Sequence, residues 1–266
     1  MRKQFIISSI KIIFNHPKLF LNLFTFDFHK IYCSYFQFQL QQTQKIYKSF
    51  SEKLNSSSFH NSDELIENLT FIEHEIIKQF GRNNAYYFTL YYLVRTLRPK
   101  IVVETGVHRG VSSLFILQAL EDNGEKDNML YSIDLPLSKY NVEKGDQTQS
   151  FLAPDKVGVC VLKHLKSRWT TIFGDSRTEL PILMNTLGKE SVGVFLHDSK
   201  HTYEHMMWEF ETMWPHIQND QGVLISDDIN WNDSFGDFIK NNKCKNHVML
   251  KKDSVTSGTF GVISKN

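Results

Sequence analysis

The sequence has few of the features that mark several large classes of protein. Its three cysteines, Cys33, Cys160 and Cys244, lie far apart and form no CxxC pair, so neither a zinc site nor a disulfide framework is indicated. For such a chain we expect a reducing, cytoplasmic setting. An excess of one charge is also missing, because 30 Lys and Arg residues stand against 29 Asp and Glu residues. Nucleic acid is therefore not an expected partner.

A hydrophobic run that could cross a membrane is lacking as well. The first residues, MRKQFIISSIKIIF, are interrupted by Lys11 and are too short for a transmembrane span. They contain no small-residue cleavage site of the kind that a signal peptide has. One interpretation is a helix that binds a membrane surface or a partner protein. The interpretation we favour is a helix that packs on its own domain or on a second subunit.

The rest of the sequence predicts a helical extension and one larger domain. Residues 1–62 are rich in Phe, Lys, Gln, Asn and Ser and end in a polar link, so we expect helices followed by a loop there. Through this extension the chain could form a homo-oligomer. Residues 63–266 then form the main domain, and helical spacing predicts helices over 63–77 and 86–97 at its start.

From residue 101 onward, strand and helix patterns alternate. Apolar runs predict strands at 101–106, 129–136, 169–176, 192–198 and 222–229. The stretches between them predict helices at 111–122, 157–166, 177–188, 201–217 and 234–242. The last two runs predict a closing hairpin of strands at 247–253 and 257–264.

This alternation predicts an α/β fold with a Rossmann-like, doubly wound sheet of about seven strands, parallel except for its C-terminal hairpin. Ligands of such sheets bind outside the carboxyl ends of the strands. The segment at 136–155 is long, polar and without a pattern, which is typical of a lid or binding loop.

The turn after the first strand reads ETGVHRGVSS. Gly106 and Gly110 allow a ligand to approach the backbone closely, and the N–H groups that begin the next helix attract anions. Glu104 would repel a pyrophosphate but attract a cationic ligand, and Ser112 could add a hydroxyl near a ligand carboxylate. The spacing is not the GxGxxG of nicotinamide enzymes. A turn that simply needs glycine is an equally good interpretation.

Acidic residues also end the next two strands. Asp134, in YSIDLP, could accept hydrogen bonds from both hydroxyls of a ribose. Asp175 and Ser176, in FGDS, could lie by the amine of an adenine. Each aspartate could instead cap a turn or helix. Acids at the ends of three successive strands describe a nucleoside site with a cationic end.

These three motifs resemble those of the class I S-adenosylmethionine-dependent methyltransferases, and the resemblance covers about residues 80–264. It implies S-adenosylmethionine as the cofactor. It also implies a set of cofactor-binding residues, namely Glu104, Thr105, Gly106, Gly110, Ser112, Asp134, Asp175 and Ser176.

The fourth and fifth strands end in a second group of acids. If these strands are neighbours, Asp198 converges with Asp227 and Asp228 beside the cofactor. Three uncompensated carboxylates would repel one another, and a hard divalent cation, Mg²⁺ or else Mn²⁺ or Ca²⁺, would relieve the repulsion. The ion could lower the pKa of a substrate hydroxyl. His201 could take the proton, because its ordinary pKa is near neutrality.

The pattern D-x-x-H-x-Y-E from Asp198, followed by GVLISDD, resembles methyltransferase family 24. That subgroup contains metal-dependent sugar and macrolide O-methyltransferases and cephalosporin-hydroxylase-like proteins. The resemblance implies that Asp198, Asp227 and Asp228 bind Mg²⁺ and that Asp198 and His201 are the catalytic pair. The chain departs from the subgroup at Asp227, where glutamate is common, and at His197, which could compete with His201 as the base.

Simpler interpretations exist for these residues. Asp198 could cap the following helix, His201 could be solvated, and Asp227 with Asp228 could open a turn. Trp231 could line a substrate pocket or belong to an ordinary loop.

We therefore expect an O-methyltransferase that acts on a hydroxyl of a small molecule or glycan, such as a sugar or natural product. Three alternatives remain. A metal-independent methyltransferase would be insensitive to chelators. A non-catalytic binding protein would be unaffected by His201→Ala, and an oxidoreductase would bind NAD tightly.

Overall fold

The computed structural model describes residues 85–136, 152–252 and 258–265. Its strands are β1 (Ile101–Thr105), β2 (Met129–Asp134), β3 (Trp169–Phe173), β4 (Val194–His197), β5 (Gly222–Ser226), β6 (Asn246–Lys251) and β7 (Thr259–Lys265). Its α-helices are α5 (Ala85–Leu97), α6 (Val111–Asp122), α8 (Ser176–Leu187), α9 (Tyr203–Met213) and α10 (Ser234–Asn241). The expected extension at 1–62, its role in assembly, the helix at 63–77 and most of the segment 136–155 lie outside the described residues.

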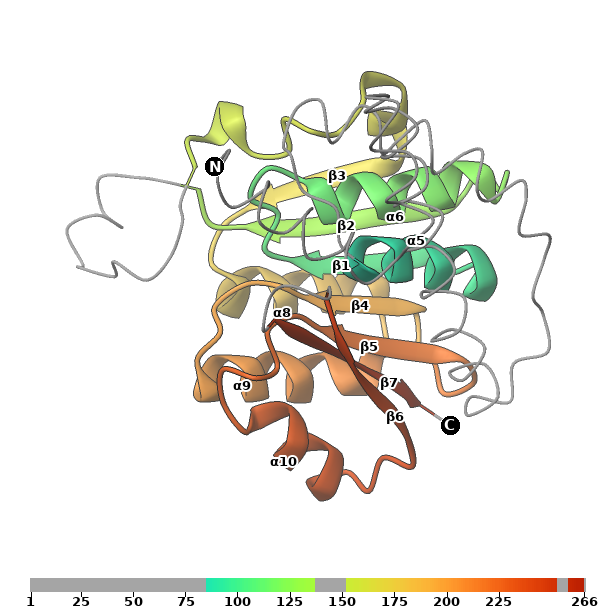
Figure 1. Cartoon of the computed structure of the whole chain (residues 1–266). Coiled ribbons are helices and arrows are strands. Elements are labelled where there is room, and N and C mark those ends of the chain that lie inside the picture. Colours follow the sequence, from blue (N-terminus) through green and yellow to red (C-terminus); the bar gives the residue numbers. More distant parts are fainter. Residues whose placement is uncertain (1–84, 137–151, 253–257, 266) are drawn as a thin grey trace, which may run out of the picture.

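All seven strands form one sheet in the order β3-β2-β1-β4-β5-β7-β6 (Figure 1). Strands β1 to β5 are parallel, whereas β7 runs antiparallel between β5 and β6. The predicted doubly wound sheet with an antiparallel C-terminal hairpin is therefore confirmed. In the central register, Thr105 lies beside His197 and His197 beside Ser226. The residues that follow these three strand ends must emerge at the same edge of the sheet.

Helices cover both faces of the sheet (Figure 1). Helices α5 and α6 pack with one set of strand side chains, such as Val102 and Leu196. Helices α8, α9 and α10 pack with the alternate set, such as Val103 and Phe195. Because both faces are buried, the strands are apolar at nearly every position rather than at every second one.

The helix predicted at 157–166 is wrong. Residues 157–162 form a turn, flanked by the short 3₁₀ helices Pro154–Lys156 and Lys163–Arg168. The amide of Gly158 donates to the carbonyl oxygen of His108 at 2.9 Å, and the amide of Cys160 donates to the carbonyl oxygen of Arg109 at 2.9 Å. These backbone groups are thus paired with the turn after β1 instead of with a helix of their own.

The predicted helix at 201–217 is shorter than expected. Helix α9 ends at Met213, and Trp214–His216 continues it as a 3₁₀ turn that contains Pro215. Proline cannot donate the hydrogen bond that a continuing α-helix needs.

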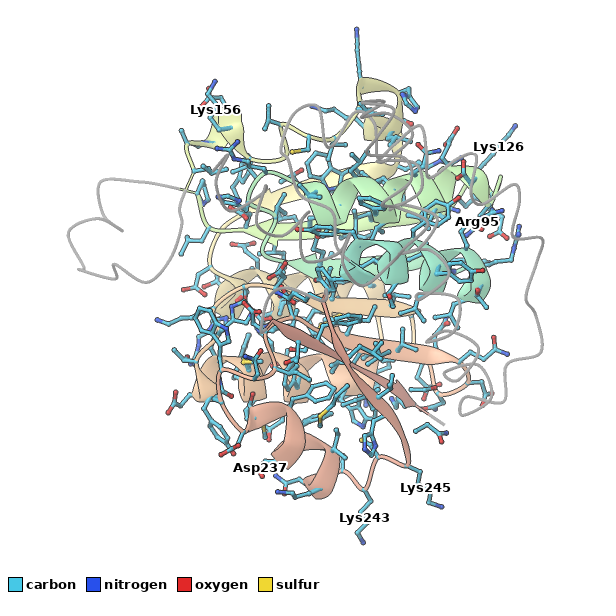
Figure 2. The ribbon with its side chains drawn as sticks, viewed as in Figure 1. Arg95, Lys126, Lys156, Asp237, Lys243 and Lys245 are labelled. Atoms are coloured by element: carbon cyan, nitrogen blue, oxygen red, sulfur yellow. The ribbon has the colours of Figure 1, made fainter. Side chains whose placement is uncertain are left out.

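Several lysines lie at the periphery of the fold. Figure 2 shows Lys126, Lys156, Lys243 and Lys245 projecting away from the sheet. No helix in the described part of the chain combines the length and the apolar character that a membrane crossing needs.

Candidate active site

Two glycines shape the loop that crosses the carboxyl edge of the sheet. Gly106 has a φ of +84°, and a Cβ there would lie 2.0 Å from the backbone oxygen of Asp198. Gly110 has a φ of +78°, and its Cβ would lie 2.8 Å from the Cα of Gly158. Both positions require glycine for backbone conformation and for space. The predicted cofactor loop therefore lies directly against the start of the second acidic group.

Glu104 is fully buried beneath this loop. Its carboxylate accepts hydrogen bonds from Ser112 Oγ at 2.5 Å, Ser113 Oγ at 2.6 Å and Ser132 Oγ at 2.7 Å. Burial raises the pKa of Glu104, and the three hydroxyls partly oppose that rise. Glu104 thus joins β1, β2 and α6. We expected the hydroxyl of Ser112 to lie near a ligand, but it donates to Glu104. Ser113 and Ser132 were missed by the sequence analysis.

Asp134 holds the same loop from the end of β2. Its Oδ2 accepts hydrogen bonds from the amide nitrogens of Val107 at 2.7 Å and His108 at 2.8 Å. The carboxylate is therefore placed beside the glycine loop, at the edge where a ribose would lie in the predicted site.

The two residues expected near an adenine have other contacts. Asp175 is the N-cap of α8, and its Oδ1 accepts from the amide of Arg177 at 2.9 Å. This is the helix-capping role that the sequence left open. The buried Ser176 hydroxyl lies 3.1 Å from Nε2 of His205. Contact of either residue with an adenine stays a prediction.

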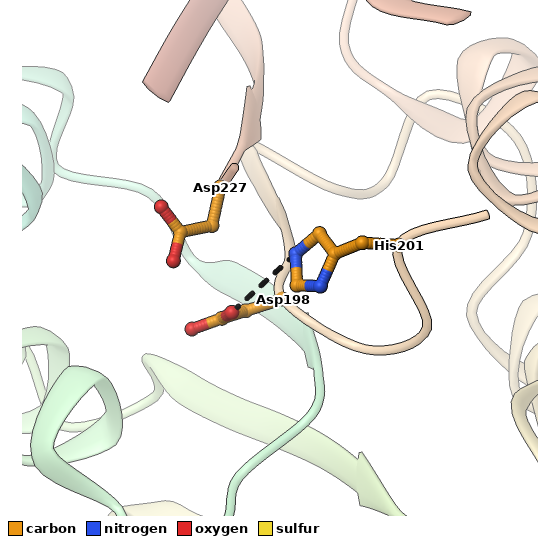
Figure 3. A group of neighbouring side chains, drawn as sticks. All are labelled: Asp198, His201 and Asp227. Carbon is orange, nitrogen blue, oxygen red and sulfur yellow. Dashed lines mark ion pairs between the residues drawn. The ribbon is translucent and has the colours of Figure 1, made fainter. Parts of the chain in front are cut away.

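The ends of β4 and β5 bring three titratable side chains together. Asp198, His201 and Asp227 each offer a ligand atom within 4.8 Å of the others, and Figure 3 shows them converging from the two strand ends. The Nε2 of His201 lies 3.8 Å from Oδ1 of Asp198. The buried atoms His201 Nε2 and Asp227 Oδ1 have no hydrogen-bond partner among the described residues.

A lysine that the sequence analysis missed neutralises part of this cluster. The Nζ of Lys252 donates to Asp227 Oδ2 at 2.6 Å and to Asp228 Oδ1 at 2.7 Å. Asp228 is outside the converging group and has a left-handed φ of 45°. The carboxylates are therefore partly compensated in this structure, whereas the prediction of a metal assumed that they were not compensated at all.

The electrostatic surroundings differ between the acids and the histidine. Burial, then the charge of Asp227, raises the pKa of Asp198, while Lys252 opposes the rise. Burial also raises the pKa of Asp227, against the effect of Lys252. Burial and then the charge of His197 lower the pKa of His201 to about 4. His201 is thus a neutral imidazole near pH 7, able to accept a proton or to coordinate a cation.

A buried glutamate anchors the segment that carries these groups. Glu209, fully buried on α9, accepts hydrogen bonds from Thr105 Oγ1 at 2.6 Å and Ser199 Oγ at 2.8 Å. Its two oxygens also lie 2.6 Å from His197 Nδ1 and 2.9 Å from His205 Nε2. The only feature of the sequence that could have indicated this buried anchor is the position of Glu209 within the otherwise apolar face of HMMWEF.

This anchor changes the interpretation of two predicted residues. His197 is fully buried and engaged with Glu209, so it does not face a substrate, and the alternative that His197 is the base is not supported. Thr105, expected in the cofactor loop, is likewise fully buried and bonded to Glu209. His201 is the histidine that lies beside the acids.

One exposed aromatic residue flanks the cluster. The Trp231 side chain is 62% exposed, and its ring centroid lies 5.5 Å from that of His201. The neighbouring Asn232 donates from Nδ2 to the carbonyl of His201 at 3.3 Å. The loop after β5 is therefore tied to the loop after β4, and Trp231 stands at the open side of the site.

Comparison with known proteins agrees with this geometry. Residues 103–229 match the model of methyltransferase family 24, described as a methyltransferase domain. This stretch of the chain is therefore similar to a methyltransferase domain. No curated protein has a significant match to the sequence.

Solved structures are similar to the chain at low sequence identity. A proposed O-methyltransferase from Klebsiella pneumoniae is 12% identical, with 82% of this chain and 96% of that chain covered and a TM-score of 0.51. An O-methyltransferase from Bacillus cereus, solved with SAH, is also 12% identical, with coverages of 85% and 100% and a TM-score of 0.49. An O-methyltransferase of tomaymycin synthesis from Streptomyces achromogenes, solved with SAM, has 12% identity, coverages of 84% and 96% and a TM-score of 0.48.

Proposed function

We propose that the protein is an O-methyltransferase that transfers the methyl group of S-adenosylmethionine to a hydroxyl of a sugar, glycan or natural product. The observation that carries this proposal is the convergence of Asp198, His201 and Asp227 at the carboxyl edge of the sheet. Gly106 packs against the backbone of Asp198, so the cluster adjoins the predicted cofactor loop. An acceptor held by the cluster would therefore lie close to the methyl donor.

When bound, S-adenosylmethionine would supply a methyl group from its sulfonium sulfur to the acceptor oxygen. The chain supplies the surface that orients it. The loop from Gly106 to Gly110 permits close backbone approach, and Asp134 fixes that loop through two amides. Positioning of this kind is a large part of catalysis when two molecules must react.

His201 is the residue that we assign as the general base. Its imidazole is neutral near pH 7 because its pKa is lowered to about 4, and Nε2 is free of other partners within the described chain. The proton of the acceptor hydroxyl would pass to Nε2 as the oxygen bonds to carbon, and would then leave to water.

The donor set also fits a divalent cation. Two carboxylates and one imidazole converge, and Asp227 Oδ1, 5% exposed as a residue, lacks a partner among the described residues. Asp198 and Asp227 would hold Mg²⁺, Mn²⁺ or Ca²⁺, and Asp228 would join them if Lys252 moved away. Such an ion would lower the pKa of a nearby hydroxyl.

A second candidate is a methyltransferase that needs no metal. The ion pairs of Lys252 with Asp227 and Asp228 favour it, because they already supply a cation to the site. His201 would then act as the base without help from an ion.

Methyl transfer to a panel of hydroxylated sugars tests the proposal. We expect S-adenosylhomocysteine to form with wild-type protein, and much less to form with Asp198→Asn. The control is Asp237→Asn, because Asp237 lies on α10 away from the site (Figure 2). Added EDTA then separates the two candidates: lost turnover indicates the metal-dependent enzyme, and unchanged turnover the metal-independent one. Equal activity of Asp198→Asn and wild type would contradict the role of the cluster.

A further inference from the structure

Lys252 pairs with two of the acids that were predicted to bind a cation. Its ammonium nitrogen lies 2.6 Å from Asp227 Oδ2 and 2.7 Å from Asp228 Oδ1. Two of the three acids predicted to bind a metal therefore already share a positive charge. The lysine side chain is only 15% exposed, so this is an internal ion pair rather than one of the surface pairs that contribute little.

Surrounding residues fix the path of this side chain. At the base of the β6–β7 hairpin, the amide of Lys252 donates to the carbonyl of Gly258 at 2.9 Å. A Cβ at Gly258 would lie 2.9 Å from Lys252 Cδ, so the lysine stem passes directly over this glycine. The Nζ also lies 5.6 Å from the ring centroid of the buried Tyr86, as in a cation–π contact.

A divalent ion on Asp227 Oδ1, which has no partner among the described residues, would lie close to the ammonium group on Oδ2. Two positive charges on one carboxylate repel each other strongly where water is largely excluded. Binding of an ion to Asp227 therefore favours release of Lys252, which would leave Asp228 without this partner as well. The free energy of separating the lysine from both acids is then subtracted from the binding of the ion.

We propose that Lys252 is a built-in competitor of the divalent cation and sets the affinity of the site for it. This inference rests on the cation site of the proposed function. With Lys252 in place the site binds a divalent ion weakly, and Asp227 and Asp228 share one positive charge when no ion is present. Loss of the lysine charge leaves Asp198, Asp227 and Asp228 uncompensated, and the ion then binds more tightly.

Titration with Mn²⁺, followed by the loss of the free-ion electron paramagnetic resonance signal, tests the proposal on full-length protein. We expect Lys252→Met to bind Mn²⁺ about tenfold more tightly than wild type, or more. Lys252→Arg keeps the charge and should stay within about threefold of wild type. Lys240→Met removes an exposed lysine that pairs with Asp237 and should behave as wild type. Equal Mn²⁺ affinity of Lys252→Met and wild type would overturn the inference.

A measurement on the wild-type protein covers the case in which Lys252→Met does not fold. Acetylation of lysines by a reactive ester is followed by mass spectrometry, with and without Mn²⁺. Displacement by the ion predicts that acetylation of Lys252 rises when Mn²⁺ is added, while that of the exposed Lys240 stays constant. Unchanged acetylation of Lys252 at saturating Mn²⁺ would show that the two cations do not compete.

Binding of S-adenosylhomocysteine to the same samples separates this inference from the proposed function. If the nucleoside binds and the Mn²⁺ affinities do not differ as described, the role of Lys252 is wrong and the methyltransferase assignment stands. If the Mn²⁺ affinities differ as described and no nucleoside binds, Lys252 is a competitor at a cation site and the proposed function is wrong.

Discussion

Two neighbouring histidines, His197 and His201, have different surroundings and therefore different roles. His197 is fully buried and its Nδ1 faces Glu209, so it helps to hold the end of β4. His201, at the same edge of the sheet, lies between Asp198 and the exposed Trp231. The sequence alone could not assign these two roles. The histidines lie only four residues apart, at a strand end and in the following loop, where hydrophobic pattern does not show which side chain is buried.

Replacement of His201 tests its role as the base. We expect His201→Ala to lower kcat by about 10²- to 10⁴-fold, the usual contribution of a general base, with little change in S-adenosylhomocysteine binding. The control is His164→Ala, since His164 lies in the short helix Lys163–Arg168 and is exposed. A kcat within a factor of about three of wild type would remove His201 from the mechanism.

The pH dependence of catalysis offers a second test of His201. Burial and the charge of His197 lower its pKa from the ordinary 6.5 to about 4, so the base stays deprotonated as the pH falls below 6.5. We therefore expect kcat/KM without added metal to show no acid limb near pH 6.5, and to fall only as the pH nears about 4. A decline centred near pH 6.5 in wild type that is absent in His201→Ala would contradict this account.

Replacement of Glu209 is expected to have a large effect on the stability of the fold. Burial alone raises its pKa, but the charge and hydrogen bond of His197, with those of His205, hold that pKa well below the ordinary 4.5. A depressed carboxyl pKa stabilises the folded state above the unfolded pKa, and this stabilisation is lost as the pH falls through the folded pKa. We expect Glu209→Gln to lower the free energy of unfolding by about 2–4 kcal/mol at pH 7.

Urea unfolding at several pH values measures this difference. The gap between wild type and Glu209→Gln should shrink as the pH falls below about 4.5. Glu211→Gln is the matched control, because Glu211 lies on the same helix and is exposed. A gap that does not shrink at any pH below about 4.5 would show that charge at Glu209 is not what stabilises the site.

At the scale of elements, the glycine loop after β1 shows which parts of the site the sequence could predict. The strand ends, the glycines and the convergence of Asp198 with Asp227 follow from hydrophobic pattern and parallel topology. The turn at 157–162 does not, because its amides pair with a loop about 50 residues away in the chain. Lys252 and Glu209 were also missed, since their partners are set by tertiary packing and not by local spacing.

The loop also gives an element-scale prediction. Gly106→Ala would place a Cβ 2.0 Å from the Asp198 carbonyl oxygen at a φ of +84°, so we expect loss of S-adenosylhomocysteine binding and about 1–3 kcal/mol of destabilisation. Gly236→Ala is the control: Gly236 lies within α10 with no atom within 4 Å of its would-be Cβ. That change should be neutral or stabilising by up to about 1 kcal/mol. Normal binding by Gly106→Ala would contradict the assignment of the cofactor loop.

At the scale of the whole molecule, the sheet order and the hairpin place the predicted cofactor loop and the acidic cluster at the same carboxyl edge of the sheet. The β1 end carries the loop predicted to bind the cofactor, while β4, β5 and the hairpin bring Asp198, Asp227 and Lys252 together beside it. The hairpin was predicted only as two closing strands, yet its Lys252 adds a positive charge to the site. Methyl donor and acceptor would therefore meet where the parallel and antiparallel parts of the sheet adjoin.

The most direct test of the central claim is a calorimetric titration of the full chain with S-adenosylhomocysteine. The account predicts saturable binding of one nucleoside per chain, which is lost in Gly106→Ala and kept in Gly236→Ala. Absence of binding to the folded wild-type protein would contradict the assignment of the carboxyl edge as a methyl-donor site, and with it the proposed function.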